Sequence, residues 1–91
     1  VRLLYSRGNR LYVVINPFNE HMLAPASEKR YRLLKGDAES WLQAEDVPYD
    51  APPVLPSAEY ADASHPLSAG YARLARRLLE QESFQDWLVE E

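Results

Sequence analysis

The chain has no cysteine, only three glycines and only two histidines among its 91 residues. The absence of cysteine excludes disulfide bonds and thiolate metal sites. Gly8, Gly36 and Gly70 are isolated from one another, so the glycine-rich loop that cradles phosphate in nucleotide-binding proteins is missing. The longest apolar run, residues 11–15, falls far short of the roughly 18 to 20 residues that span a bilayer. The sequence therefore excludes several common classes of site before any motif is considered.

What is present is typical of a small soluble domain. Hydrophobic residues make up 46% of the chain and charged residues 26%. We expect a single domain over residues 1–91, because domains usually contain about 100 to 150 residues. A chain of this size buries only about 60 to 65% of its unfolded surface, so a partner would help to stabilise it.

The first residues carry no apolar run of the length found in signal peptides, and we expect a cytoplasmic protein. The sequence does not begin with methionine, which leaves a removed leader open.

Charge is divided unevenly along the chain. Residues 1–36 contain seven basic and two acidic side chains, whereas residues 37–91 contain three basic and twelve acidic ones. Such an asymmetry marks either a basic face that meets an acidic partner or two halves that neutralise each other within one fold. The second interpretation is favoured, because exposed charges usually form an ordinary solvated surface.

The amino-terminal residues predict an antiparallel hairpin. Residues 3–5 and 11–15 are apolar, and Gly8-Asn9 between them tolerates the positive φ of a tight turn. Asn16 and Pro17 end the second strand, and residues 21–24 are a candidate third strand.

Short helices are predicted for the remainder. Residues 28–35 favour a helix capped by Ser27 and ended by Gly36, with a strand over 30–35 as the alternative, and a further helix is expected over 38–44. The proline-rich strap, residues 46–57, is expected to pack as an extended segment between the two halves.

An apolar stripe predicts the best helix of the chain after Pro66, with a break at Glu82-Ser83 before a short last helix. The fold class expected is α+β: a small antiparallel two- or three-stranded sheet at the N-terminus, packed against three to four short helices.

Few residues suggest chemistry. Glu59, Asp62 and His65 recur every three residues and would line one helix face as metal ligands. Pro66 argues against this, because it disfavours helical geometry at His65. We therefore predict no catalytic residue, no metal and no cofactor, and a small metal-assisted enzyme ranks third among the functions considered.

The second function considered is nucleic-acid binding through the basic amino-terminal sheet. Five arginines with tyrosines between them would combine contacts to phosphate with stacking on bases: Arg2, Arg7, Arg10, Arg30 and Arg32.

The leading prediction is a non-enzymatic module that docks onto a protein partner and regulates it. Large rings are numerous for so short a chain, and rings left outside a modest core act as anchors in protein interfaces. The candidate protein-binding residues are Trp87, Phe84, Tyr49 and Tyr60.

Overall fold

The computed structural model describes residues 1–89. In chain order the elements are α1 (Arg2–Ser6), β1 (Val13–Val14), a 3-10 turn (Glu20–Met22), α2 (Pro25–Ala44), β2 (Tyr49–Asp50), a second 3-10 turn (Ser57–Glu59), α3 (Ser68–Glu80) and α4 (Glu82–Val89). The described part of the chain is thus mostly helical.

The two strands form a parallel pair, with Val13 opposite Tyr49 and Val14 opposite Asp50. The prediction of an antiparallel sheet is therefore wrong. The physical reason is α2, whose 20 residues extend for about 30 Å. This helix returns the chain to the start of β1, so the next strand runs in the same direction as β1, as in a strand–helix–strand unit.

The amino-terminal hairpin is replaced by a helix. Residues 3–5 lie in α1, so residues 11–15 have no antiparallel neighbour there. Gly8 does adopt a positive φ of 79°, but it turns the chain out of a helix rather than between two strands. The predicted third strand at 21–24 also fails, because Glu20–Met22 form a 3-10 turn.

Helix is confirmed over residues 28–35, within an element much longer than expected. The helix α2 continues through Gly36, so the separate helix predicted over 38–44 is part of the same element. A Cβ at Gly36 would meet nothing within 4 Å, which shows that this glycine faces open space rather than ending the helix.

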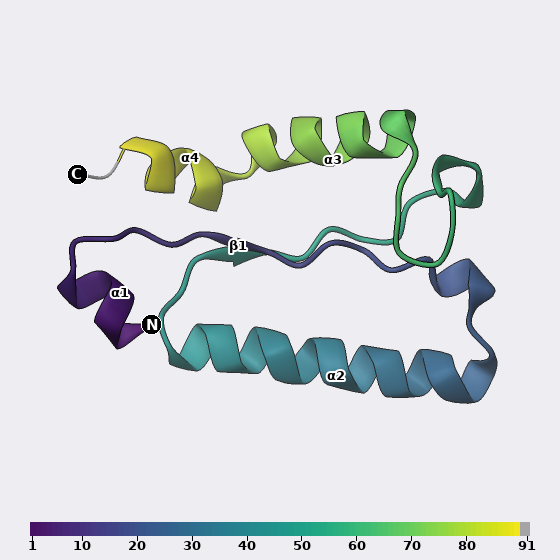
Figure 1. Cartoon of the computed structure of the whole chain (residues 1–91), viewed down its shortest axis with the longest axis horizontal. Helices are drawn as coiled ribbons and strands as arrows, with labels where there is room; N and C mark the ends of the chain where they lie inside the picture. The colour runs from purple at the N-terminus through teal and green to yellow at the C-terminus, as the bar shows by residue number, and fades with distance from the viewer. Residues whose placement is uncertain (90–91) are drawn as a thin grey trace.

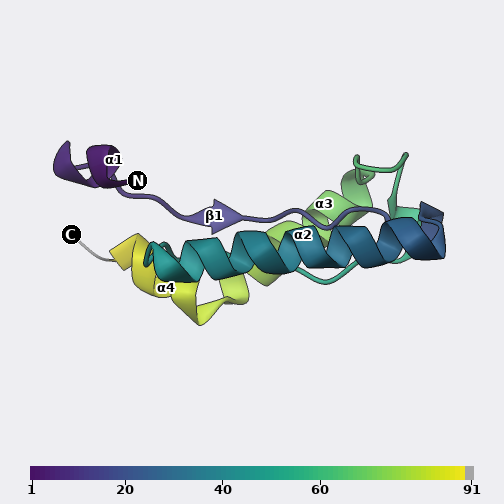
Figure 2. The ribbon, with the colours of Figure 1, turned by 90° about the horizontal axis from the view of Figure 1, so that it is seen from below.

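The sheet lies between two helical layers. Figure 1 shows the strands edge-on in the centre, with α2 along one face and α3 and α4 along the other. Figure 2, turned by 90°, shows β1 along one margin of this flat molecule, which measures 41 × 28 × 19 Å. Each layer contains only one or two helices or strands.

The carboxy-terminal helices follow the predicted pattern, except that the break lies just before Glu82-Ser83, which begin α4. The apolar stripe forms α3, and the chain breaks at Gln81, whose φ of −73° and ψ of 124° are extended, before α4 begins at Glu82. An ion pair of 3.1 Å joins Arg77 of α3 to the buried carboxylate of Asp50 in β2, which fixes this helical layer to the sheet.

The core is small. Among the described residues, the core contains Leu42, Val47, Leu55 and Tyr60, and the buried prolines are Pro17, Pro52 and Pro66. No helix within residues 1–89 combines the length and the apolar character needed to cross a membrane.

Candidate functional site

A tight loop between Tyr60 and Pro66 carries a hydrogen-bonded cluster of polar side chains. Tyr60 and Pro66 form an isolated antiparallel bridge. The amide of Ala61 donates to the carbonyl oxygen of His65 at 2.7 Å, and the amide of Leu67 donates to that of Glu59 at the same distance. These bonds close the loop at its base, and we call residues 60–66 the corner loop.

Asp62 and His65 form a hydrogen-bonded pair within the corner loop. The ring nitrogen Nδ1 of His65 lies 2.9 Å from Oδ1 and 3.0 Å from Oδ2 of Asp62. The hydrogen bonds of this ring all involve Nδ1, so Nε2 has no partner among residues 1–89. The ring is therefore oriented by a carboxylate at one nitrogen and open to solvent at the other.

The local sequence explains this geometry. Oδ1 of Asp62 also accepts the backbone amides of Ser64 at 2.9 Å and His65 at 2.8 Å, which is the turn that aspartate side chains commonly make with residues that follow them. Pro66 is buried and holds His65 out of helical geometry. Three hydrogen bonds lower the pKa of Asp62 below its ordinary value of 3.8. The largest effect comes from the amide of Ser64, and the ring and the amide of His65 contribute less. This carboxylate is therefore charged at neutral pH.

The corner loop lies at the carboxyl end of the sheet. Figure 1 shows β1 running toward it, with the segment after β1 passing beside the green loop, and β2 runs parallel to β1. Asn19, which follows β1, donates its amide to the carbonyl oxygen of Ala63 at 2.9 Å. Its side-chain Nδ2 lies 3.4 Å from the carbonyl oxygen of Asp62. Parallel α/β proteins bind their ligands beyond this end of the strands.

An open groove of about 430 Å³ lies beside the corner loop, with Ser64 as one of its lining residues. Pro17, Phe18, Tyr31 and Leu34 contribute most of its apolar wall. The ring of Phe18 packs at 5.5 Å from that of Tyr31, whose hydroxyl accepts the amide of Phe18 at 3.2 Å. The groove has the size of a small-molecule site.

The three metal ligands considered from the sequence, Glu59, Asp62 and His65, do not form one cluster in the fold. Glu59 binds Arg73 through two parallel hydrogen bonds of 3.0 and 2.9 Å, and this ion pair raises the pKa of Arg73. Residues 1–89 contain no group of three histidine, aspartate or glutamate side chains that could hold a metal ion. Asp62 and His65 are left as a pair.

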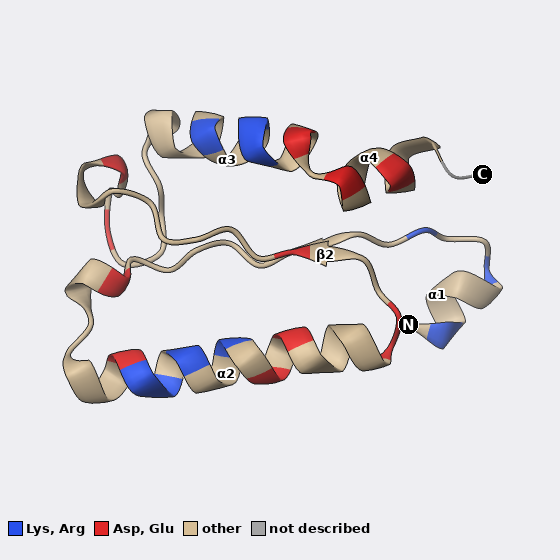
Figure 3. Cartoon of the chain, turned by 180° about the vertical axis from the view of Figure 1, so that it is seen from behind, with Lys and Arg blue, Asp and Glu red and all other residues tan. Residues whose placement is uncertain are grey.

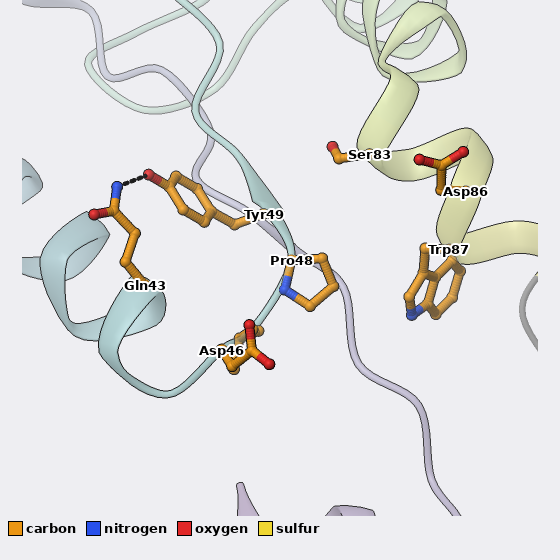
Figure 4. Close-up of a pocket in the computed structure, with 8 residues that line it drawn as sticks. Gln43, Asp46, Pro48, Tyr49, Ser83, Asp86 and Trp87 are labelled. Atoms are coloured by element: carbon orange, nitrogen blue, oxygen red, sulfur yellow. Dashed lines mark hydrogen bonds between the residues drawn. The ribbon is translucent and has the colours of Figure 1, made fainter.

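Of the four predicted protein-binding residues, Phe84 and Trp87 lie in α4 and Tyr49 begins β2. Trp87 stacks against Phe84 at 5.7 Å, and Tyr12 packs edge-on against Phe84 at 5.0 Å. Figure 4 shows Tyr49 and Trp87 at two sides of a pocket of about 530 Å³, with the hydroxyl of Tyr49 accepting a 2.8 Å hydrogen bond from Gln43. The rings of Tyr12, Phe84 and Trp87 therefore form one aromatic cluster, and Tyr49 lies across the pocket from it.

Tyr60 lies apart from this cluster and is only 7% exposed. Its hydroxyl accepts the amide of Leu55 at 3.1 Å and faces the carbonyl oxygens of Pro17 and Phe18 at 3.2 and 3.3 Å. Tyr60 thus anchors the corner loop from within, rather than offering its ring on the surface.

The five candidate arginines are distributed over separate elements, and the basic sheet expected to carry them does not form. Arg2 belongs to α1, Arg7 follows it, and Arg30 and Arg32 lie on α2. Figure 3 shows basic and acidic residues side by side along α2. Arg32 pairs with Glu20 and Glu28, and Arg10 covers the ring of Trp87 at 4.6 Å.

The sequence had singled out Asp62 and His65, but as metal ligands on a helix. The signal that identifies the pair is an aspartate three residues before a histidine that itself precedes proline, a pattern that builds a turn instead of a helix. No family model, no curated protein and no solved structure matches this chain. The function is therefore argued from the site alone.

Proposed function

We propose that this chain supplies an acid–base pair, Asp62 and His65, to an active site for acyl transfer that a second polypeptide surface completes. The observation that carries the proposal is the 2.9 Å hydrogen bond between Nδ1 of His65 and the carboxylate of Asp62, with Nε2 free. An aspartate–histidine hydrogen bond also orients the histidine of serine hydrolases, where the aspartate is buried. Here the side chains of His65 and Asp62 are 69% and 58% exposed, so the completing surface must cover them. The position at the carboxyl end of parallel strands supports it further.

The chemistry follows from the two ring nitrogens. A hydroxyl nucleophile placed at Nε2 gives up its proton to His65 as its oxygen attacks the carbonyl carbon of an ester. Asp62 stabilises the imidazolium that forms, and the proton then passes to the leaving alcohol as the ester bond breaks. Water repeats the same sequence to release the acid.

The nucleophile comes from the completing surface. Within residues 1–89 the hydroxyl nearest the ring is that of Ser64, 3.3 Å from Nδ1, the nitrogen that already faces Asp62. Ser64 is therefore on the wrong side of the ring to be activated. The apolar groove beside the loop suits the acyl part of the substrate.

The test uses the protein isolated with its partners from its native source, a fluorophosphonate probe for activated serines, and p-nitrophenyl butyrate as substrate. We expect His65→Gln and Asp62→Asn to lower hydrolysis by roughly 10³- to 10⁴-fold. His21→Gln is the matched control, because His21 bonds through its ring to the carbonyl oxygen of Leu55 and belongs to no such pair. An inactive assembly, or full activity in His65→Gln, contradicts the proposal.

The second function that we propose is docking onto a protein partner, as predicted from the sequence. A separate observation supports it. Large apolar side chains are exposed on every helix, including Leu33 and Leu34 of α2 at 62% and 61% and Val89 of α4 at 77%. Exposed apolar surface on this scale is typical of protein interfaces. The two proposals are compatible, since an active site shared with a partner requires docking.

The docking function is tested by affinity capture from the native source with and without nuclease. We expect the double variant Leu33→Ser/Leu34→Ser to recover at least tenfold less partner than wild type, with the neighbouring Lys29→Ser as control. Capture that disappears with nuclease instead favours nucleic-acid binding. The cytoplasmic location also stays a proposal, which cell fractionation tests.

A further inference from the structure

The pocket of about 530 Å³ lies at the opposite end of the molecule from the corner loop. Helix α4 forms one side of it, and the end of α2 with the start of β2 forms the other (Figure 4). Its volume is that of a small-molecule site. The acid–base pair proposed above does not touch this pocket, so it is a separate candidate for binding.

The walls of the pocket are acidic. They include two carboxylates, those of Asp46 and Asp86, and no lysine, arginine or histidine. Neither carboxylate belongs to an ion pair within residues 1–89. Residues 37–91 carry twelve acidic and only three basic side chains, so the surrounding charge also attracts cations. The electrostatics of the pocket therefore favour a positively charged ligand.

The two carboxylates lie on different sides of the pocket. Asp46 follows α2, whereas Asp86 belongs to α4. Figure 4 shows the rings of Pro48 and Trp87 in the region between them. Two negative charges separated by apolar rings match a molecule that carries a positive charge at each end and methylene groups between.

The aromatic ring of this pocket already contacts a cation. The guanidinium group of Arg10 lies 4.6 Å from the centre of the Trp87 ring, as in other contacts between cations and indole rings. Arg10 lines an adjoining hollow of about 200 Å³, which shares Asp46, Pro48 and Trp87 with the pocket. The charge of Arg10 therefore opposes the binding of a second cation beside this ring.

We propose that this pocket binds an aliphatic diamine, with one ammonium group at Asp46 and the other at Asp86. The methylene chain of the ligand crosses the rings of Pro48 and Trp87. Each ammonium group has three donors and no acceptor. Gln43, which also lines the pocket, offers a side-chain oxygen to donors that the carboxylates leave free.

The experiment titrates the chain at low salt with diaminopropane, diaminobutane, diaminopentane and diaminohexane, and with butylamine as the matched monoamine. Binding is followed by the NMR signal of the Trp87 indole N–H. The indole of Trp41, which does not line the pocket, is the internal control. Because the second ammonium group binds in an intramolecular step, we expect the best diamine to bind about tenfold more tightly than butylamine. Equal affinities, or equal shifts at both indoles, overturn the proposal.

Removing one carboxylate at a time tests the two ends of the site. Asp46→Asn and Asp86→Asn should each lower the affinity for the best diamine to about that for butylamine. Asparagine tolerates the positive φ of 55° at residue 46, so the backbone is kept. Asp37→Asn, at an exposed residue of α2 outside the pocket, is the matched control and should change the affinity by less than about twofold. An equal loss in Asp37→Asn shows only a general attraction of cations to an acidic chain, and it contradicts the site.

Arg10→Gln tests the sign of the electrostatic effect. Because this variant removes a positive charge beside the pocket, it should strengthen diamine binding by about two- to fivefold. Weaker binding in Arg10→Gln, with the Trp87 indole signal of the free protein unchanged, contradicts the proposal.

Discussion

The corner loop and the outer side of α2 differ sharply in how completely they are packed. Around the corner loop, Leu55 is 3% exposed and Tyr60 7%, and Pro66 and Gly70 are buried. By contrast, α2 buries Leu42 alone among its 20 residues. The residues beneath the corner loop are therefore well packed, whereas most of α2 is exposed.

The difference indicates what each region requires. A carboxylate and a ring that act together must be held within a fraction of an ångström. The side chains of Asp62 and His65 are themselves exposed, so the backbone hydrogen bonds to Asp62 and the buried residues beneath the loop provide this. A surface that binds a partner gains most from apolar side chains that stay exposed until the partner covers them.

Truncating a leucine should separate the two regions most clearly. Leu55→Ala removes a buried side chain beside the corner loop and should cost about 2 to 5 kcal/mol of unfolding free energy. Leu34→Ala, at a side chain that is 61% exposed, should change it by less than about 0.5 kcal/mol. Urea denaturation measures both, and equal costs would contradict the contrast in packing.

A methyl group added at Gly70 should strain the same region. Its Cβ would lie 2.8 Å from the carbonyl oxygen of Glu59 and 3.0 Å from atoms of Leu55 and Pro66. Since the nearest atom is backbone, we expect Gly70→Ala to destabilise the fold by about 1 to 3 kcal/mol. The NMR signals of His65 should shift with it, and unchanged stability would show that the loop is less rigid than the contacts imply.

Removing the hydroxyl of Tyr60 should lower the free energy of unfolding by a smaller amount. It should also change how this free energy depends on pH. Tyr60→Phe leaves the amide of Leu55 without its acceptor and should cost about 1 to 2 kcal/mol. Burial raises the pKa of Tyr60 above the ordinary value of 10.0, so the unfolded chain releases this proton first as pH rises.

The stability that Tyr60 confers is therefore complete below pH 10 and is lost as pH rises through the raised pKa of the folded state. Urea midpoints measured from pH 8 to 11.5 should fall more steeply for wild type than for Tyr60→Phe. Parallel curves would show that another group is responsible for the alkaline loss.

The helices were predictable because their signals are local. The stripe after Pro66 and the break before α4 depend on residues within a few turns of one another. The direction of the sheet was not predictable in this way, since the partner of Val13 is Tyr49, 36 positions away. A turn-forming Gly8 indicates that the chain bends, without indicating whether a strand or a helix precedes the bend.

The candidate site could be predicted only in part, for the same reason. Asp62 and His65 were recognisable as residues able to act together, but their contact depends on a turn that a helical spacing does not reveal. Their place at the carboxyl end of the strands depends further on the parallel pairing, whereas the local sequence pattern predicts an antiparallel one. The aromatic cluster gathers Tyr12, Phe84 and Trp87 from the two ends of the chain, so proximity in sequence gives no indication of it.

Gly36 gives the smallest prediction and the best control for Gly70. It lies within α2 although the sequence suggested that it ends a helix, and a Cβ there would meet nothing within 4 Å. Because alanine restricts the unfolded chain and favours helix, Gly36→Ala should stabilise the fold by about 0.5 to 1 kcal/mol. Thermal unfolding of Gly36→Ala and Gly70→Ala should therefore shift in opposite directions. A loss of stability in Gly36→Ala would show that α2 is interrupted at this position in solution, and that the exposed side of the molecule is less helical than its packed corner.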